Sequence, residues 1–373
     1  LGQVLIYPYY TSNAGNQTIL SVVNTTDSAK AVKVRFLEGF NSREVLDFNL
    51  YMSAYDVWVA AIADGGDLGF AEQAGVPHLV VPDTSCTVPY LYGDSVEAGL
   101  PFGLQAFLPY AYTGKNTDGG PTDISRTTEG HIEMIEMGTL TNDSERSPKT
   151  LGSSDPGRMG SADAATHVVV DGDDVPADCY QLVRNWTDYD APSAKDDPYD
   201  GMWFEEATFG ESEVAECDDS AASQSCTDTV RNSGGLFGGA AVVNSGNGTM
   251  FSYDAKAVQG FDKSDDGIHF VPGTIYPSLN SGSENVAYVF FGTPSYEVQE
   301  LYYPFERTVE AVSALFMHDN VMNTFTIQED LDAATEWVLT FPTKSFYVDP
   351  EVTGLVDEIW IPDVNDPFCN DWE

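Results

Sequence analysis

The sequence is poor in basic residues. Lys and Arg together number 16 against 59 Asp and Glu, which gives the 373-residue chain a formal net charge of −43 at pH 7. Binding to DNA, RNA or an anionic membrane surface requires clustered Lys and Arg that neutralise phosphates. So few basic residues in so acidic a chain exclude these partners, and we expect no nucleic acid among its ligands.

Long apolar runs are missing as well. No stretch approaches the roughly 18 apolar residues of a membrane-spanning helix, so the sequence predicts no membrane span. The chain also lacks a charged-then-apolar secretion signal at its start, yet it begins at Leu1 without a Met. We interpret this as export with the signal peptide removed, which predicts an extracellular or cell-surface location. A partial chain is the alternative.

Motifs for catalysis are absent. There is no G-x-S-x-G turn for a nucleophile and no H-E-x-x-H zinc motif, and the Gly-rich segment 234–239 lacks the Lys of a phosphate-binding loop. The 59 acidic residues offer too many pairs for any two to be singled out as glycosidase carboxylates. The sequence therefore provides no catalytic residues, and we expect a protein that is not an enzyme.

Cysteine is scarce, and none of the five cysteines forms the C-x-x-C spacing of a zinc or redox site. Disulfides are the better interpretation. Cys217 and Cys226 bracket a short Asp/Ser loop and could close it, which leaves Cys86 with Cys179 as a long-range pair. Cys369 then has no partner within the chain.

Apolar residues are nevertheless sufficient for a folded core, at 42% hydrophobic and 12% aromatic. Short runs rich in β-branched and aromatic residues recur with turn residues between them, which predicts strands. The clearest predicted strands are residues 4–9, 18–24, 31–37, 45–50, 55–62, 131–137, 234–244, 248–261 and 285–292. Turn signals every 8 to 12 residues are typical of a mainly β fold, and we predict an antiparallel β-sandwich, Ig-like or jelly-roll-like.

Four segments follow from this pattern. We predict N-terminal sandwich strands in residues 1–138, a long acidic, loop-rich insertion in 139–232, further strands with short helices in 233–345, and a C-terminal strand and tail in 346–373. In the strand around residues 131–137 we expect Glu133 and Glu136 to face solvent. Helical spacing of apolar residues predicts a helix over 306–318 and a shorter helical turn over 329–336, and 337–341 reads as a strand.

One local motif indicates a metal. The sequence Asp262-Lys263-Ser264-Asp265-Asp266-Gly267 places oxygen side chains at alternate positions before a glycine turn, as calcium loops do. Asp262, Ser264 and Asp266 are therefore candidate calcium ligands. A plain acidic turn is the alternative, because position twelve is Gly273 rather than the Glu of an EF-hand.

The first strand suggests self-assembly. Val4, Leu5, Ile6 and Tyr7 form an apolar start to the chain, whereas free termini are usually polar. Either this segment pairs within its own sandwich, or it completes the sheet of a neighbouring subunit and so builds a homopolymer.

The segments IYPYYTSNAGNQTILSVVNTTDSAKAVKVRFLEGFNS and GGLFGGAAVVNSGNGTMFSYDAKAVQGF, with WVLTFPTKSFYVDP near the end, resemble a family of uncharacterised secreted β-rich surface proteins of marine and other gammaproteobacteria. The resemblance spans most of the chain and implies export, a β-rich fold and a place on the cell surface. It carries no catalytic motif. It also implies a chain that continues beyond Glu373, where Cys369 would find a partner.

These observations predict an extracellular structural protein, the subunit of a bacterial surface filament or surface layer. Two alternatives remain open. One is a secreted carbohydrate-binding or carbohydrate-cleaving protein whose exposed aromatic residues contact glycans. The other is a monomeric calcium-dependent adhesin, for which the acidity and the 262–267 loop would be the basis.

Overall fold

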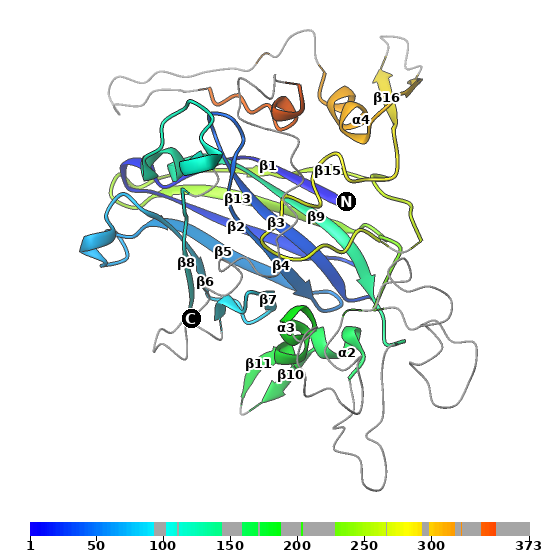
Figure 1. Ribbon diagram of the computed structural model, residues 1–373, viewed down its shortest axis with the longest axis horizontal. Coiled ribbons are helices and arrows are strands. Elements are labelled where there is room, and N and C mark those ends of the chain that lie inside the picture. Colours follow the sequence, from blue (N-terminus) through cyan, green and yellow to red (C-terminus); the bar gives the residue numbers. More distant parts are fainter. Residues whose placement is uncertain are drawn as a thin grey trace, which may run out of the picture.

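The computed structural model describes residues 1–92, 102–109, 112–143, 159–170, 172–187, 203, 228–265, 267–292, 298–317, 322 and 337–347. Over these ranges the chain is mainly β, and two antiparallel sheets pack face to face (Figure 1). The predicted antiparallel β-sandwich is therefore confirmed. No helix in the described ranges is long and apolar enough to cross a membrane.

Sheet 1 has six strands in the order β14-β13-β2-β5-β6-β8. Their bounds are Thr249–Asp254, Leu236–Asn244, Asn16–Asn24, Val57–Asp64, Pro77–Val81 and Gly103–Ala106, in the same order. The hairpin predicted around Ser245-Gly246-Asn247 joins β13 to β14. β13, from late in the chain, pairs along its whole length with β2, so early and late strands build one sheet.

Sheet 2 has the order β15-β1-β9-β3-β4-β7, and a short strand, β12, also pairs with β9. The bounds, in this order and ending with β12, are Lys256–Val258, Val4–Thr11, Glu129–Leu140, Lys30–Glu38, Glu44–Met52, Cys86–Val88 and Thr229–Val230. Pro8 lies where the pairing of β1 with β9 shifts register, which lets a residue without an N–H occupy an inner strand.

The core between the sheets follows from strict alternation along the strands. Trp58 of β5 and Phe48 of β4 pack against each other at 5.8 Å between ring centroids, and both are fully buried. Tyr10, Phe36 and Phe107 form a second cluster of edge-on and tilted rings. Such buried aromatic contacts contribute much of the stability of a sandwich.

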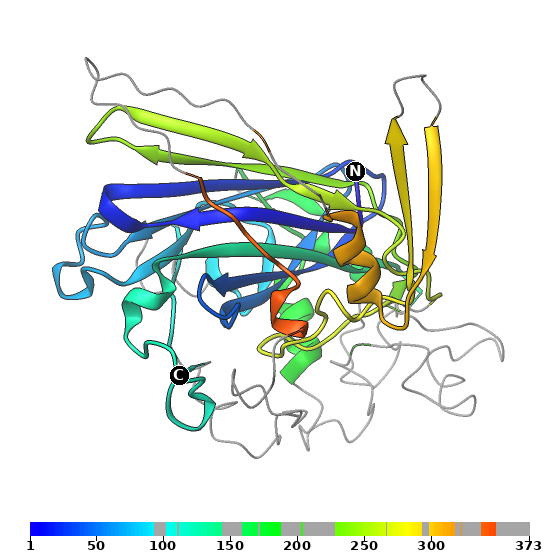
Figure 2. The ribbon, with the colours of Figure 1, turned by 90° about the horizontal axis from the view of Figure 1, so that it is seen from above.

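The second face of sheet 2 is covered by later parts of the chain. Val4, Ile6 and Ile135 pack beneath Val309 and Val312 of the helix α4, Thr308–Leu315. Figure 2 shows α4 and the 337–347 segment lying along the β1 side of the sandwich. α4 confirms the centre of the predicted 306–318 helix. Residues 337–341 form no strand, which corrects that prediction, and residues 329–336 lie outside the described ranges.

Burial of both faces of β9 also corrects the expectation for its charged residues. Glu133 and Glu136 do not face solvent; their side chains are 1% and 0% exposed and pair with Arg35 and Lys30. Local alternation alone could not reveal this, because residues 233–234, more than 90 positions away, supply part of the cover.

Smaller elements complete the described chain. The acidic insertion contributes α2 (Ser161–Ala165), the hairpin β10 (His167–Val170) with β11 (Asp173–Pro176), and α3 (Cys179–Thr187). A second hairpin pairs β16 (Val286–Gly292) with β17 (Val298–Pro304). Short 3-10 turns lie at 13–15, 71–73, 114–116, 124–128 and 344–346.

Candidate interaction surface

The outer face of sheet 1 is apolar and open to solvent. Along β13 every second residue is buried in the core, and the residues between them are half-buried or exposed. β2 and β5 show the same alternation. The outward residues of these three strands, which we call the sheet 1 face, are Gln17, Ile19, Ser21, Val23, Val57, Val59, Ala61, Phe237, Gly239, Ala241 and Val243.

None of these outward residues is charged, although the chain carries a net charge of −43. Phe237 and Ile19 are each 48% exposed and Val57 is 47% exposed. On the adjoining edge strand β14, Met250 is 68% exposed, and Asp254 contributes the only outward charge of that strand. Apolar patches of this kind are typical of interaction sites, which makes the sheet 1 face the candidate interaction surface.

The strand register arranges the face in rows. The first row holds Phe237, Val23 and Val57, which lie side by side on β13, β2 and β5. A second row, two residues further along the strands, holds Gly239, Ser21 and Val59, and a third holds Ala241, Ile19 and Ala61. The face thus combines large side chains, mainly in the first row, with smaller ones in the second and third rows.

Much of the scarce positive charge is inside the protein. Lys30, Lys33, Arg35 and Arg126, four of the 16 basic residues, are almost completely buried. Arg126 joins Glu38 and Asp118 at one end of the sandwich, with N–O distances of 2.9 Å to Glu38 and 2.5 Å to Asp118. Six buried carboxylates pair with these four cations, so the outer surface remains strongly acidic and carries fewer cations.

A strip of buried charges also runs along the covered face of sheet 2. Lys33 pairs with Asp47, and Arg35 pairs with Glu44 at 2.6 Å and with Glu133 at 2.8 Å. The segment around residues 269–273 closes over this strip, where Gly273 N donates to Asp47 Oδ2 at 2.9 Å. Burial and the neighbouring Asp47 raise the pKa of Glu44 to about 7, against the opposing effect of Arg35. These contacts hold the 269–273 segment on sheet 2.

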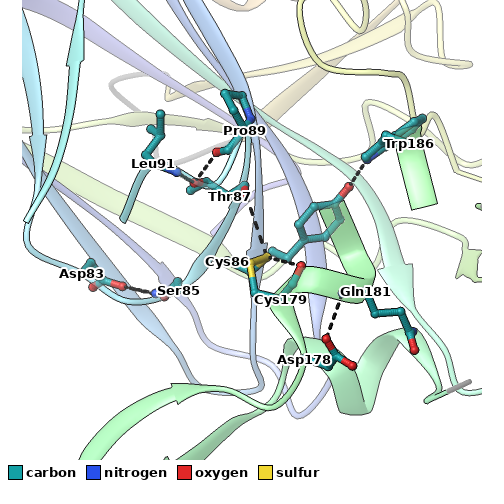
Figure 3. The surroundings of a disulfide bond; sticks show 11 residues. Asp83, Ser85, Cys86, Thr87, Pro89, Leu91, Asp178, Cys179, Gln181 and Trp186 are labelled. Carbon is teal, nitrogen blue, oxygen red and sulfur yellow. Dashed lines mark hydrogen bonds between the residues drawn. A yellow bond between two sulfur atoms is a disulfide. The ribbon is translucent and has the colours of Figure 1, made fainter. Parts of the chain in front are cut away.

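The predicted disulfide between Cys86 and Cys179 is present, with an S–S distance of 2.03 Å and a sequence separation of 93 residues. It joins β7 of sheet 2 to the first residue of α3 (Figure 3). Nearby, Trp186 Nε1 of α3 donates to the hydroxyl of Tyr51 at 2.9 Å. The disulfide and this bond fix the middle of the acidic insertion to the sandwich. Cys217, Cys226 and Cys369 lie outside the described residues.

Two of the three candidate calcium ligands, Asp262 and Ser264, lie within the described residues. Asp262 is fully buried, and its carboxylate accepts hydrogen bonds from Asn232 Nδ2, Ser264 Oγ, Ser264 N and Ser283 N. Asp266 lies outside the described residues. In the described part of the chain, no three His, Cys, Asp or Glu side chains are grouped to hold a metal ion. The bonds to Asp262 are those of the alternative, an acidic turn, and calcium stays a prediction.

The segment that could have completed a neighbour's sheet, Val4 to Tyr7, pairs within its own chain. All four are buried within the chain's own sandwich, because β1 pairs with β9 on one side and with β15 on the other. Both edges of β1 are thus engaged, as in the ordinary first strand that was the alternative. If subunits associate, the sheet 1 face is the better candidate.

Comparison with known proteins gives no match to a family model, a curated protein or a solved structure. The resemblance to secreted gammaproteobacterial proteins therefore stays a prediction.

Proposed function

We propose that this protein is an extracellular structural subunit that associates with its neighbours through the sheet 1 face, in a surface filament or layer. The single observation that supports this proposal is the uncharged, apolar and uncovered character of that face on a chain of charge −43. Asp262, a candidate calcium ligand, accepts hydrogen bonds from Asn232, Ser264 and Ser283.

Burial of the face would supply a useful free energy. Phe237, Ile19, Val57 and Met250 are about half exposed or more, and complete burial of a large apolar side chain stabilises by about 1.5–3 kcal/mol. The four residues together would then contribute roughly 3–7 kcal/mol. Association also has an entropic cost of similar size, so a contact on this face alone is weak and reversible. Weak contacts repeated over many subunits suit an assembled layer or filament.

Sedimentation velocity and electron microscopy of the purified protein test the proposal. We expect wild-type protein to form oligomers at raised concentration and salt, and the variant Phe237→Asp to remain monomeric. Val169→Asp is the matched control, because Val169 is 75% exposed on β10, away from the sheet 1 face, and its replacement should leave assembly unchanged. Monomeric wild-type protein under all these conditions would overturn the proposal.

A further inference from the structure

We infer that Lys33 and Asp47 react with each other in the folded protein and join β3 to β4 by an amide bond, with loss of one water. Lys33 Nζ is in contact with Asp47 Oδ2, and the two side chains are 0% and 2% exposed. Both lie on the covered face of sheet 2, on neighbouring antiparallel strands. The sheet 1 face is not involved, so this inference is independent of the proposed function.

The segment that closes over this pair already has the hydrogen-bond partners that an amide needs. Val271 O lies 3.5 Å from Lys33 Nζ and accepts from it, and Gly273 N donates to Asp47 Oδ2 at 2.9 Å. An amide between the two side chains keeps one N–H on the lysine nitrogen and one C=O on the aspartate carbon. Both groups of the product would therefore keep the partners that segment 269–273 provides.

The other lysine buried in the described part of the chain, Lys30, offers no such fit. Its partner Glu136 accepts from Ser233 N at 3.0 Å through Oε1 and from Gly234 N at 2.7 Å through Oε2. An amide there would remove one of these oxygens and leave a backbone N–H without its acceptor, which is costly. The hydrogen bonds thus select the first pair, although the two ion pairs are about equally buried.

The same strip supplies an acid for the reaction. Its titratable side chains are Lys33, Arg35, Glu44, Asp47, Glu133 and His131. The lysine and the arginine provide two positive charges against three carboxyls, and His131 Nε2 lies 3.6 Å from Glu133 Oε1. Burial first and Asp47 second raise the pKa of Glu44 to about 7, so a large share of Glu44 is protonated at neutral pH.

Glu44 is also placed near the reacting pair. Its Oε2 accepts from Arg35 Nε at 2.6 Å, and Arg35 stands directly opposite Asp47 in the register of β3 with β4. A neutral carboxylic acid beside an amine and a second carboxyl is the group that amide formation needs to move its protons.

The reaction balances without a co-reactant. Proton transfer within the ion pair gives a neutral Lys33 amine and a neutral Asp47 acid. The amine nitrogen attacks Asp47 Cγ and a C–N bond forms, while the N–H of Gly273 stabilises the charge that develops on Oδ2. Protonated Glu44 gives its proton to the Oδ1 hydroxyl, which leaves as water, and takes up the proton that the new amide nitrogen releases.

Burial favours the product. Two charges that are costly to hold away from water are replaced by a neutral amide with both hydrogen bonds made. The site is complete only in the folded chain, because Gly273 lies 226 positions after Asp47 in the sequence. The bond therefore forms after folding, and it prevents β3 and β4 from separating.

Mass spectrometry of the reduced and denatured full chain tests the inference. We expect wild-type protein to have a mass one water below that of its sequence, and a proteolytic digest to contain a branched peptide that joins Lys33 to Asp47. Lys33→Arg should have the full mass of its sequence, because a guanidinium stays protonated and does not attack a carboxyl. Lys263→Arg is the matched control and should keep the deficit, since Lys263 is 54% exposed.

Glu44→Gln tests the proton donor. The variant keeps the size of the side chain and has no carboxyl proton to transfer, so the linked fraction should fall at least about tenfold while circular dichroism still shows a folded sandwich. Full linkage in this variant would refute the reaction as written.

A wild-type mass equal to that of the sequence would overturn the inference, and so would a water loss that maps to any other position. Peptides that contain Lys30 and Glu136 should be unlinked in the same digest, and a link between them would show that the hydrogen-bond partners do not select the site. None of these results bears on association through the sheet 1 face, so the two proposals fail separately.

Discussion

The buried pair of Lys30 and Glu136 gives a sharp test of how the sandwich is held together. Lys30 Nζ lies 2.6 Å from Glu136 Oε1, and both side chains are 0% exposed. Glu136 also accepts hydrogen bonds from the backbone N–H groups of Ser233 at 3.0 Å and Gly234 at 2.7 Å. The carboxylate thus connects β9 and β3 to the turn that leads into β13.

Removing one partner should be costly. Lys30→Met leaves a buried carboxylate without its cation, and breaking a buried pair in this way typically destabilises by about 3–5 kcal/mol. The double variant Lys30→Met with Glu136→Gln removes both charges and keeps an amide oxygen for one of the two N–H groups. We expect it to lose only about 1–3 kcal/mol, the cost of the remaining unsatisfied donor.

Urea unfolding followed by tryptophan fluorescence measures these differences as shifts in the transition midpoint. Lys263→Met is the matched control, since Lys263 pairs with Glu284 at 2.9 Å but is 54% exposed, and such pairs contribute at most about 1 kcal/mol. A double variant no more stable than Lys30→Met, or a loss below about 1 kcal/mol in Lys30→Met, would refute the reasoning.

The stability lost in Lys30→Met should also depend on pH. Burial raises the pKa of Glu136, and Lys30 opposes that rise. Without Lys30 the pKa should rise further. A carboxyl whose folded-state pKa is raised loses stability as pH increases above its ordinary value, because the unfolded chain ionises first. The deficit of Lys30→Met relative to wild type should therefore be larger at pH 8 than at pH 5. A deficit that is constant across this range would contradict the assignment of the cost to an ionised, unpaired carboxylate.

Three further predictions concern other parts of the fold. Reduction of the Cys86–Cys179 disulfide, which closes a separation of 93 residues, should lower the free energy of unfolding by about 4–5 kcal/mol in the chain-entropy model, and a midpoint unmoved by reductant would contradict it. Glu44 has its pKa raised to about 7 by burial and by Asp47, so its contribution to stability should fall between pH 4.5 and 7; Glu44→Gln should flatten this part of a melting-temperature profile, and an unchanged slope would speak against it. Deletion of residues 1–10 should abolish folding, as measured by circular dichroism, because β1 is an inner strand of sheet 2; a folded truncated protein would show that β1 is dispensable.

The strands of the sandwich could be predicted because their pattern is local. Residues 31–37 and 45–50 alternate between apolar and other side chains over most of their length, and each lies within an observed strand of nine residues. A strand carries its periodicity in neighbouring positions, so no knowledge of its partners is needed. The disulfide followed from elimination among the few cysteines, which is also a property of the sequence alone.

The burial of charge could not be predicted in this way. Glu133 and Glu136 are interspersed with apolar residues as exposed side chains are, but Arg35 and Lys30 reach them from β3, 98 and 106 residues earlier in the chain. A sequence shows which acidic and basic side chains are present but not which of them form ion pairs. With only 16 basic residues, however, their concentration in β3 (Lys30, Lys33 and Arg35) was an available indication that this strand carries buried pairs.

The sheet 1 face was missed for a different reason. LFGGAAVVN, TILSVVN and VWVAAI are apolar or uncharged at inward and outward positions alike, which is typical of strands covered on both sides. The apolar start of the chain suggested assembly through Val4–Tyr7, but the structure buries these residues in its own sheet. Comparing both faces of each strand, rather than seeking one apolar segment, would have indicated the outer face.

The acidity of the chain offsets a risk that its exposed apolar face creates. An uncovered face of this size on a neutral protein would promote indiscriminate aggregation, since hydrophobic attraction has no direction. Strong negative charge on the rest of the surface opposes association between copies in general, and in the proposed assembly the uncharged faces are where this repulsion is weakest. Burying Lys30, Lys33, Arg35 and Arg126 as ion pairs strengthens this selection, because no exposed cation at those positions can offer an alternative contact. Ionic strength then sets the balance, because screening weakens the repulsion while leaving the apolar contact intact.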